Sequence, residues 1–262
     1  MLAAGDIADC SSAGDEATAA LLDARPAGVV ATLGDNVYDS GTPREFAECY
    51  APTWGRHKDR TRPAPGNHDY DTTHAAGYFG YFGAAAGDPT KGYYSYDLGA
   101  WHVIVLNSNC PSTSCEVGGS QERWLRTDLA ASGASCTLAY WHHPPFSSGS
   151  THGSDDAVAP LFRALYEAGA ELVLAGHEHN YERFAPLAPS GKVDPARGIR
   201  TFVVGTGGRS LYGFGSPHPG SEARNRDAFG ILALDLEAGG YRWEFVPQAG
   251  KTFTDSGSGT CH

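Results

Sequence analysis

Several features that would narrow the function are missing from this sequence. None of its 262 residues lies in an apolar run long enough to span a bilayer, which takes about 20 residues in a helix. No two cysteines have the C-x-x-C or ribbon spacing of a structural zinc site. Internal repeats, linkers and low-complexity segments are also absent. We therefore expect a single domain over residues 1–262, with a flexible tail over 251–262 unless Cys261 is bridged.

Positive charge is also scarce. The chain has 19 lysines and arginines against 30 aspartates and glutamates, so its formal net charge is −11. This sign argues against a surface that coats nucleic acid, whose phosphates attract basic residues. It also argues against a basic patch that anchors to anionic lipid. We expect neither a nucleic-acid nor a membrane partner and interpret the acidity as a source of solubility, while the oligomeric state stays open.

The six cysteines lie at scattered loop positions. An even number at such positions favours disulfides and an extracytoplasmic setting, and the alternative is a cytosolic enzyme with free thiols. The predicted pairs, out of 15 possible arrangements, are Cys110–Cys115, Cys136–Cys261 and, as the remainder, Cys10–Cys49. No signal peptide precedes the first predicted strand, which begins directly after Met1. We therefore expect a secreted protein whose N-terminus has been processed or trimmed.

Hydrophobic patterning predicts strands that alternate with helices along most of the chain, followed by strands alone. The expected strands cover residues 2–4, 28–33, 93–98, 101–106, 136–141, 172–175, 201–204, 229–236 and 240–246. The expected helices cover residues 14–25, 43–50, 120–131 and 156–168. A loop rich in glycine, tyrosine and phenylalanine is expected to run on to Gly87. The pattern indicates an α/β protein whose last strands are antiparallel.

Potential metal ligands follow five of the apolar segments. They are Asp6, Asp35, Asn67, His142, and His177 with His179. In four of the five cases a glycine directly precedes the ligand or its group, which lets the backbone turn sharply and approach a bound group. Each case alone is ordinary, because Gly-Asp and Gly-Asn are common turn dipeptides. Since ligands bind beyond the carboxyl ends of strands in open α/β sheets, the five cases together indicate one site.

The types of ligand also agree with one another. Carboxylate and amide oxygens suit hard cations, and imidazole suits transition metals such as zinc and iron. Three histidines, two aspartates and one asparagine are enough for two metal ions if one aspartate bridges them. Two ions about 3.5–4 Å apart can clamp the attacking and leaving oxygens of a phosphoryl transfer. The ligand set is therefore sufficient for a pair of metal ions of the kind that serves phosphoryl transfer.

Five short blocks carry a resemblance to a known family. They are Gly5-Asp6, Gly34-Asp35-Asn36-Val37-Tyr38, Gly66-Asn67-His68-Asp69, His142-His143-Pro144 and Gly176-His177-Glu178-His179. In residue type and order they resemble the signature blocks of the calcineurin-like metallophosphoesterases. The resemblance implies an α/β fold, namely a four-layer α/β/β/α sandwich of two mixed β-sheets flanked by helices.

One departure from the family pattern indicates a branch. Most of the superfamily has a histidine two residues after the first aspartate, and this chain has Ala8 there, which cannot bind a metal. Tyr38, three residues after Asp35, resembles the tyrosine of the purple acid phosphatases, whose tyrosinate binds a ferric ion. A trivalent cation favours ionisation of a phenol, whose pKa is otherwise about 10. The alternative for Tyr38 is a packed loop aromatic.

The resemblance also implies a ligand set for each ion. The first ion takes Asp6, Asp35, Tyr38 and His179, and the second takes Asp35, Asn67, His142 and His177, with Asp35 as the bridge. The ions would be Fe(III) and a divalent ion, which could be iron, zinc or manganese. Together they make the site locally positive within an acidic protein.

The same resemblance implies the reaction. A metal-bound hydroxide attacks the phosphorus of a small-molecule phosphate monoester in line. His68 protonates the leaving group, and His152 is a second histidine that faces the substrate. Asp69 is expected to orient His68, because a neighbouring carboxylate raises the pKa of a histidine. For His152 the alternative is an exposed loop histidine.

Four further residues have two interpretations each. His143 either contacts phosphate or shapes its loop. Arg209 either clamps phosphate or forms a surface ion pair, which we favour. Glu178 and Glu182 either support the ligands or belong to a solvated loop.

Three other functions are considered. A phosphodiesterase of the same superfamily would use the same pair of ions. A non-catalytic phosphate-binding module would keep the ions without needing His68 or His152. A structural zinc protein would need a closed, four-coordinate site, and the asparagine among the ligands argues against it.

Overall fold

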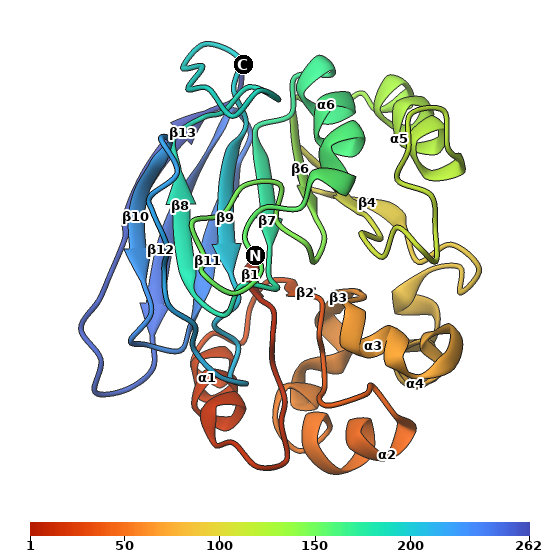
Figure 1. Ribbon diagram of the computed structural model, residues 1–262, viewed down its shortest axis with the longest axis vertical. Coiled ribbons are helices and arrows are strands. Elements are labelled where there is room, and N and C mark those ends of the chain that lie inside the picture. Colours follow the sequence, from red (N-terminus) through yellow and green to blue (C-terminus); the bar gives the residue numbers. More distant parts are fainter.

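Two β-sheets, one of six strands and one of seven, pack face to face in the computed structural model, which describes residues 1–262 (Figure 1). Side chains of both sheets share one large hydrophobic core. Each sheet contains parallel and antiparallel strand pairs, and helices flank the pair of sheets. The predicted α/β class, a four-layer α/β/β/α sandwich of two mixed β-sheets, is confirmed.

The six-stranded sheet contains strands from both ends of the chain. In spatial order they are β13 (Ser256–Thr260), β12 (Gly240–Pro247), β11 (Gly230–Glu237), β1 (Leu2–Ala4), β2 (Val30–Leu33) and β3 (Thr61–Ala64). β1, β2 and β3 are parallel, and β1 pairs with β11 in antiparallel fashion. Hydrophobic patterning does not predict β3, which contains Pro63. A proline has no N–H to donate, and it is tolerated because β3 lies at the edge of the sheet.

Residues 251–262 are held in place, as expected for a chain in which Cys261 is bridged. β13 pairs with β12, and Cys261 is bridged to Cys136. A Cβ on Gly257 would lie 2.3 Å from the ring of Trp243, and one on Gly259 would lie 2.4 Å from the ring of Tyr241. The glycines that suggested flexibility therefore allow close packing on two aromatic rings.

The seven-stranded sheet contains the central strands that the sequence predicts. In spatial order its strands are β10 (Ser221–Asn225), β8 (Tyr181–Phe184), β9 (Arg200–Val204), β7 (Leu172–Ala175), β6 (Cys136–Tyr140), β5 (Trp101–Val105) and β4 (Tyr94–Leu98). β5, β6, β7 and β9 are parallel. Along β5, Val103 and Val105 belong to the core between the sheets and Ile104 to a second core. This alternation follows from the two-residue period of a strand.

Two helices cover the second core. They are α5 (Ser120–Ala131) and α6 (Ala159–Glu167), and they lie side by side (Figure 1). The remaining helices are α1 (Gly14–Asp23), α2 (Pro43–Glu45), which continues as a π-helical turn over Phe46–Tyr50, α3 (Asn67–Asp71) and α4 (Ala76–Phe82). Short 3-10 turns cover Trp54–Arg60, Thr73–Ala75, Gly83–Ala86 and Asp156–Val158. No helix combines the length and the apolar character that crossing a membrane requires.

The segment that runs on to Gly87 is largely helical, so the predicted loop is wrong. α3 and α4 both lie in it. Phe82 of α4 is buried and packs edge-on against Phe46, Tyr50 and Tyr78. Glycine and aromatic residues have modest helix propensity, and burial of the aromatic rings overrides it here.

The three predicted disulfides are all present. They are Cys10–Cys49, Cys110–Cys115 and Cys136–Cys261, which leaves no free cysteine. The last bridge joins the first residue of β6 to the residue that follows β13, so it connects the two sheets.

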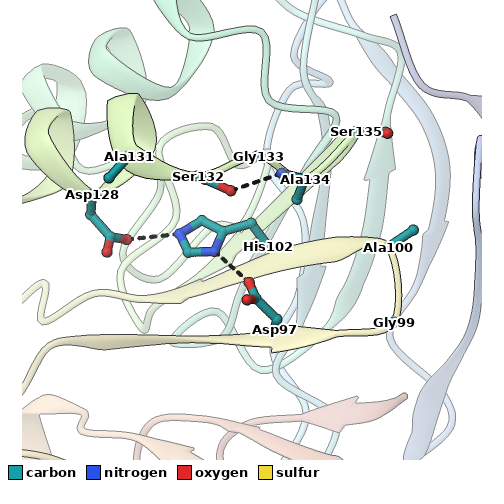
Figure 2. A pocket seen from close by; sticks show the side chains of 10 residues that line it. All are labelled: Asp97, Gly99, Ala100, His102, Asp128, Ala131, Ser132, Gly133, Ala134 and Ser135. Carbon is teal, nitrogen blue, oxygen red and sulfur yellow. Dashed lines mark hydrogen bonds and ion pairs between the residues drawn. The ribbon is translucent and has the colours of Figure 1, made fainter.

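A pocket of about 600 Å³ lies where β4 and β5 approach the end of α5 (Figure 2). His102 lies there between two carboxylates, with Nδ1 2.9 Å from Oδ1 of Asp97 and Nε2 2.8 Å from Oδ2 of Asp128. Ionised carboxylates only accept hydrogen bonds, so both contacts need the doubly protonated ring. Burial opposes that charge, but the hydrogen bonds to Asp97 and Asp128 outweigh it and raise the pKa of His102. The charged ring ties the β4–β5 hairpin to α5.

This contact is expected to lose strength as the pH rises through the pKa of folded His102. Below the unfolded value of about 6.5 the ring is charged in both states and both hydrogen bonds contribute. Because His102→Gln removes both charge-assisted bonds, it should lower the free energy of unfolding by about 1.5–3 kcal/mol at low pH. Urea unfolding at about pH 6 and about pH 9 should show a smaller difference from the wild type at the higher pH. Equal differences at both values would contradict the charged bridge.

Candidate metal centre

The predicted ligands converge at one edge of the two sheets. Asp6 follows β1, Asp35 follows β2, and Asn67 begins α3 shortly after β3. His142 follows β6, and His177 follows β7. Because the strands within each of these groups are parallel, their carboxyl ends meet at the same edge.

The glycines before these residues are required by close approach. A Cβ on Gly34 would lie 2.5 Å from Nδ1 of His142, and one on Gly66 would lie 2.1 Å from Oδ1 of Asp35. Asp6 and Asp35 have φ angles of 61° and 48°, a region that costs a non-glycine residue about 1–3 kcal/mol. The chain accepts this strain where it brings several polar side chains to one point.

Tyr38 is at the centre of one group of donor atoms. Its hydroxyl oxygen lies 2.9 Å from Oδ1 of Asp6, 2.8 Å from Oδ2 of Asp35 and 3.2 Å from Nε2 of His179. All four side chains are buried, and the hydroxyl has a single proton to share among three neighbours. Burial, and then repulsion by the two carboxylates, raises the pKa of Tyr38 well above 10. Only a strongly charged cation among these atoms would ionise the phenol.

His142 is at the centre of a second group. Its Nδ1 lies 2.8 Å from the carbonyl oxygen of Leu33, which can only accept, so Nε2 has the free lone pair in the neutral ring. Nε2 lies 3.1 Å from Oδ1 of Asn67, 3.1 Å from Nδ1 of His177 and 3.3 Å from Oδ2 of Asp35. Burial opposes protonation, but Asp35 outweighs it and raises the pKa of His142 to about 9. Without a cation, a second proton therefore binds where these atoms meet.

Asp35 belongs to both groups. Its Oδ2 faces the hydroxyl of Tyr38 on one side and Nε2 of His142 on the other. Its Oδ1 accepts a hydrogen bond of 2.8 Å from the backbone N–H of His68. Two ligand atoms that are each about 2.1 Å from one ion, at right angles, lie about 3 Å apart, and the contacts in both groups have this spacing. This spacing is the one expected of ligand atoms around a cation, and Asp35 is common to both groups.

His68 is oriented by a backbone carbonyl and not by Asp69, so that prediction is wrong. Nδ1 of His68 lies 2.5 Å from the carbonyl oxygen of Asp39. Asp69 is fully buried, and its Oδ2 accepts hydrogen bonds from the backbone N–H groups of Gly66 and Asn36. The physical reason is that adjacent residues of a helix point in different directions.

His152 and His143 both lie beside His177. The rings of His152 and His177 are 4.2 Å apart, and His152 is exposed, so its other face is accessible to a substrate. The rings of His143 and His177 are 4.4 Å apart, and Nδ1 of His143 lies 2.7 Å from Oγ of Ser108. Burial, and then repulsion by His142, lowers the pKa of His143 to about 3. His143 is thus a neutral member of the site that also binds its own loop to Ser108.

A family model described as calcineurin-like phosphoesterase matches residues 1–181. The chain belongs to this family. The match contains all seven predicted ligands of this phosphoesterase, and the strands after it complete both sheets. The family implies divalent metal ions, and donor atoms of Asp6, Asp35 and His142 lie within 4.8 Å of one another.

Several curated relatives of this phosphoesterase are purple acid phosphatases. Purple acid phosphatase 21 of Arabidopsis thaliana is 34% identical over 121 residues, which are 44% of this chain and 26% of that protein. Probable purple acid phosphatase 20 of the same plant is 31% identical over 172 residues, 61% of this chain and 39% of that protein. The chain thus spans well under half the length of these relatives. The predicted resemblance to this branch is confirmed.

Solved structures share the fold of this phosphoesterase. The purple acid phosphatase PPD1 from yellow lupin (Lupinus luteus) seeds has a TM-score of 0.73 at 18% identity and covers 98% of this chain and 52% of its own. GAP50, described as the anchor in the inner membrane complex of Plasmodium, has a TM-score of 0.71 at 15% identity and covers 97% of this chain and 86% of its own. At these identities the likeness shows the fold alone.

Two serines also bind histidines of the site, and neither was predicted from the sequence. Oγ of Ser108 lies 3.3 Å from the backbone nitrogen of His142, and Oγ of Ser210 lies 2.7 Å from Nδ1 of His179. Ser108 follows β5 at the edge where the ligands lie, so the pattern of polar residues after strands could have indicated it. Ser210 lies in an irregular turn, and no pattern in the sequence marks it.

Three charged residues near the predicted ligands, Arg209, Glu178 and Glu182, are paired or buried. Arg209 forms ion pairs with Asp9 and Asp39, as the favoured interpretation predicts. Glu178 and Glu182 are both fully buried, so the alternative of a solvated loop is wrong for them.

Proposed function

We propose that the protein hydrolyses phosphate monoesters with the help of two metal ions. The proposed ligands are Asp6, Asp35, Tyr38 and His179 for one ion, and Asp35, Asn67, His142 and His177 for the other. The observation that carries the proposal is the position of Asp35, whose Oδ2 lies 2.8 Å from the hydroxyl of Tyr38 and 3.3 Å from Nε2 of His142. When bound, such a pair of ions supplies a nucleophile at neutral pH and offsets the charge of the phosphoryl oxygens.

Two histidines outside the ligand sets are proposed to act on the substrate. His68 donates its Nδ1–H to the carbonyl oxygen of Asp39, which turns Nε2 toward Oδ2 of Asp35 at 4.0 Å. We assign His68 as the proton donor to the leaving alkoxide, a role that contributes roughly 10²–10⁴-fold to a rate. His152 lies exposed over His177, where it can bind an oxygen of the ester.

Comparison of a chromogenic phosphomonoester with the matching diester tests the proposed reaction. We expect the monoester to have the larger kcat/KM by at least about tenfold, because two ions and two histidines can bind a group with three terminal oxygens. A diester rate about ten times the monoester rate would favour the alternative, a phosphodiesterase of the same superfamily.

Elemental analysis of the same preparation tests the identity of the ions. We propose Fe(III) beside Tyr38 and a divalent iron, zinc or manganese ion in the other position. A tyrosinate on Fe(III) has a charge-transfer colour, as the resemblance to purple acid phosphatases implies. A colourless, fully active protein that contains only divalent ions would refute the assignment of a ferric ion. The proposed hydrolase activity would still stand.

A non-catalytic phosphate-binding module is the second candidate function. In that case His68→Ala and His152→Ala would leave phosphate affinity unchanged and no ester would be hydrolysed. The convergence of the donor atoms and of both histidines favours the enzyme.

We further propose an extracytoplasmic location and a single domain over residues 1–262. Three disulfides without a free cysteine support the location, because disulfides persist in oxidising compartments. The position of β1 between β2 and β11 supports the single domain. Detection of the protein in culture medium, and a single cooperative unfolding transition, would test the two proposals.

A further inference from the structure

The tip of the loop that carries His152, residues 151–153, is attached to the site by one buried carboxylate. Glu178 stands between His177 and His179 in the sequence, and its side chain is fully buried. Oε1 of Glu178 accepts hydrogen bonds from the backbone N–H groups of Thr151, His152 and Gly153, at 3.2, 2.5 and 2.6 Å. These three residues make no other hydrogen bond.

The surroundings of Glu178 leave room for this contact and for little else. A Cβ on Gly149 would lie 2.1 Å from Cδ of Glu178, so a side chain there would displace the carboxylate. Ser150 and Asp155, on either side of the attached segment, have backbone hydrogen bonds of their own. Ser154 is held separately, through hydrogen bonds between its hydroxyl group and the backbone of Ser147. Over residues 151–153, Glu178 makes all the hydrogen bonds that fix the path of the chain.

We propose that Glu178 is the positioning residue for His152, an inference that rests on the proposed hydrolysis. Hydrogen bonds to an ionised carboxylate are about twice as strong as neutral ones, and three of them fix the backbone of His152. They place its ring 4.2 Å from the ring of His177. Because Glu178 adjoins His177, the same short segment sets a proposed ligand and the histidine that faces the substrate. Small displacements of a reacting group can cost a large factor in rate.

Substitutions at Glu178 test this role through kcat on a phosphomonoester. Glu178→Ala should lower kcat by about ten- to a hundredfold, close to the loss in His152→Ala. Glu178→Gln keeps the shape and one acceptor oxygen but not the charge, so its loss should be smaller. The matched control is Glu171→Gln, because Glu171 is also buried and accepts hydrogen bonds from backbone N–H groups, but it lies directly before β7, away from His152. The control should keep the kcat of the wild type.

A double variant that combines Glu178→Ala with His152→Ala distinguishes a positioning role of Glu178 from a general structural role. If Glu178 acts through His152, adding Glu178→Ala to His152→Ala should cause no further loss of kcat. The pH profile of Glu178→Ala should match that of His152→Ala, and both should bind as much metal as the wild type. Additive losses of kcat, or a loss of metal in Glu178→Ala alone, would overturn the inference.

Gly149→Ala gives an independent test that leaves Glu178 in place. It should lower kcat as Glu178→Ala does, and it should have no effect when combined with Glu178→Ala, which leaves room for the new methyl group. If the wild type is active and the Glu178 variants keep its kcat, only the positioning role of Glu178 is rejected. A wild type that binds two ions and hydrolyses no ester would reject the proposed function instead.

Discussion

Asp35→Asn is expected to lower kcat/KM by about a thousandfold or more and to reduce bound metal from two ions to one or none. The amide keeps the shape of the side chain but loses its charge and one acceptor oxygen. Both oxygens are engaged, since Oδ2 faces Tyr38 and His142 and Oδ1 accepts from the N–H of His68. Loss of one electrostatic contact in an active site costs about 10²–10³ in rate. This substitution weakens the contacts of both ions at once, so the larger effect is expected.

Elemental analysis and steady-state kinetics on a phosphomonoester measure this effect. Asp255→Asn is the control, because Asp255 is a half-buried carboxylate that is bound to Arg183 and Tyr181 and lies outside the proposed ligand sets. It should lower stability without changing the metal content. A complete pair of ions and near wild-type kinetics in Asp35→Asn would show that Asp35 does not bridge.

The arrangement of the site was predictable because it depends on short-range patterns. A buried strand, a glycine and a polar residue are neighbours in the sequence, and parallel strands bring such ends together. The direction of each side chain was not predictable, as Asp69 and Glu178 show. Asp69 follows His68 directly and yet turns away to bind Asn36. Glu178 lies between two histidines and yet binds a loop about 26 residues earlier in the chain.

The fold was predictable where burial makes apolar runs, and the edge strand β4 was predicted as well, but β8 and the other three edge strands were not. The sequence predicts the central strands β5, β6 and β7. It does not predict β3, β10 or β13, which lie at edges and contain proline, charged residues or alternating glycines. Such strands form because they pair with a neighbouring strand, and the local sequence pattern does not show which strand that is.

Loss of the Cys136–Cys261 bridge is expected to lower the free energy of unfolding by about 5 kcal/mol, the estimate for a closed loop of this length. The bridge spans 125 residues, and it joins the start of β6 to the residue after β13. Its removal therefore frees the last strand of one sheet from the other sheet. Denaturant unfolding of the double variant Cys136→Ala/Cys261→Ala measures the loss.

Cys110→Ala/Cys115→Ala is the matched control, because it removes a bridge that spans only 5 residues. The same chain-entropy argument predicts a loss of about 2 kcal/mol for so short a loop. The packing of Gly257 on Trp243 and of Gly259 on Tyr241 is an alternative explanation, since it would hold β13 in place without the bridge. If the long bridge contributes no more than the short one, this packing and not the restriction of the unfolded chain fixes the C-terminal strand.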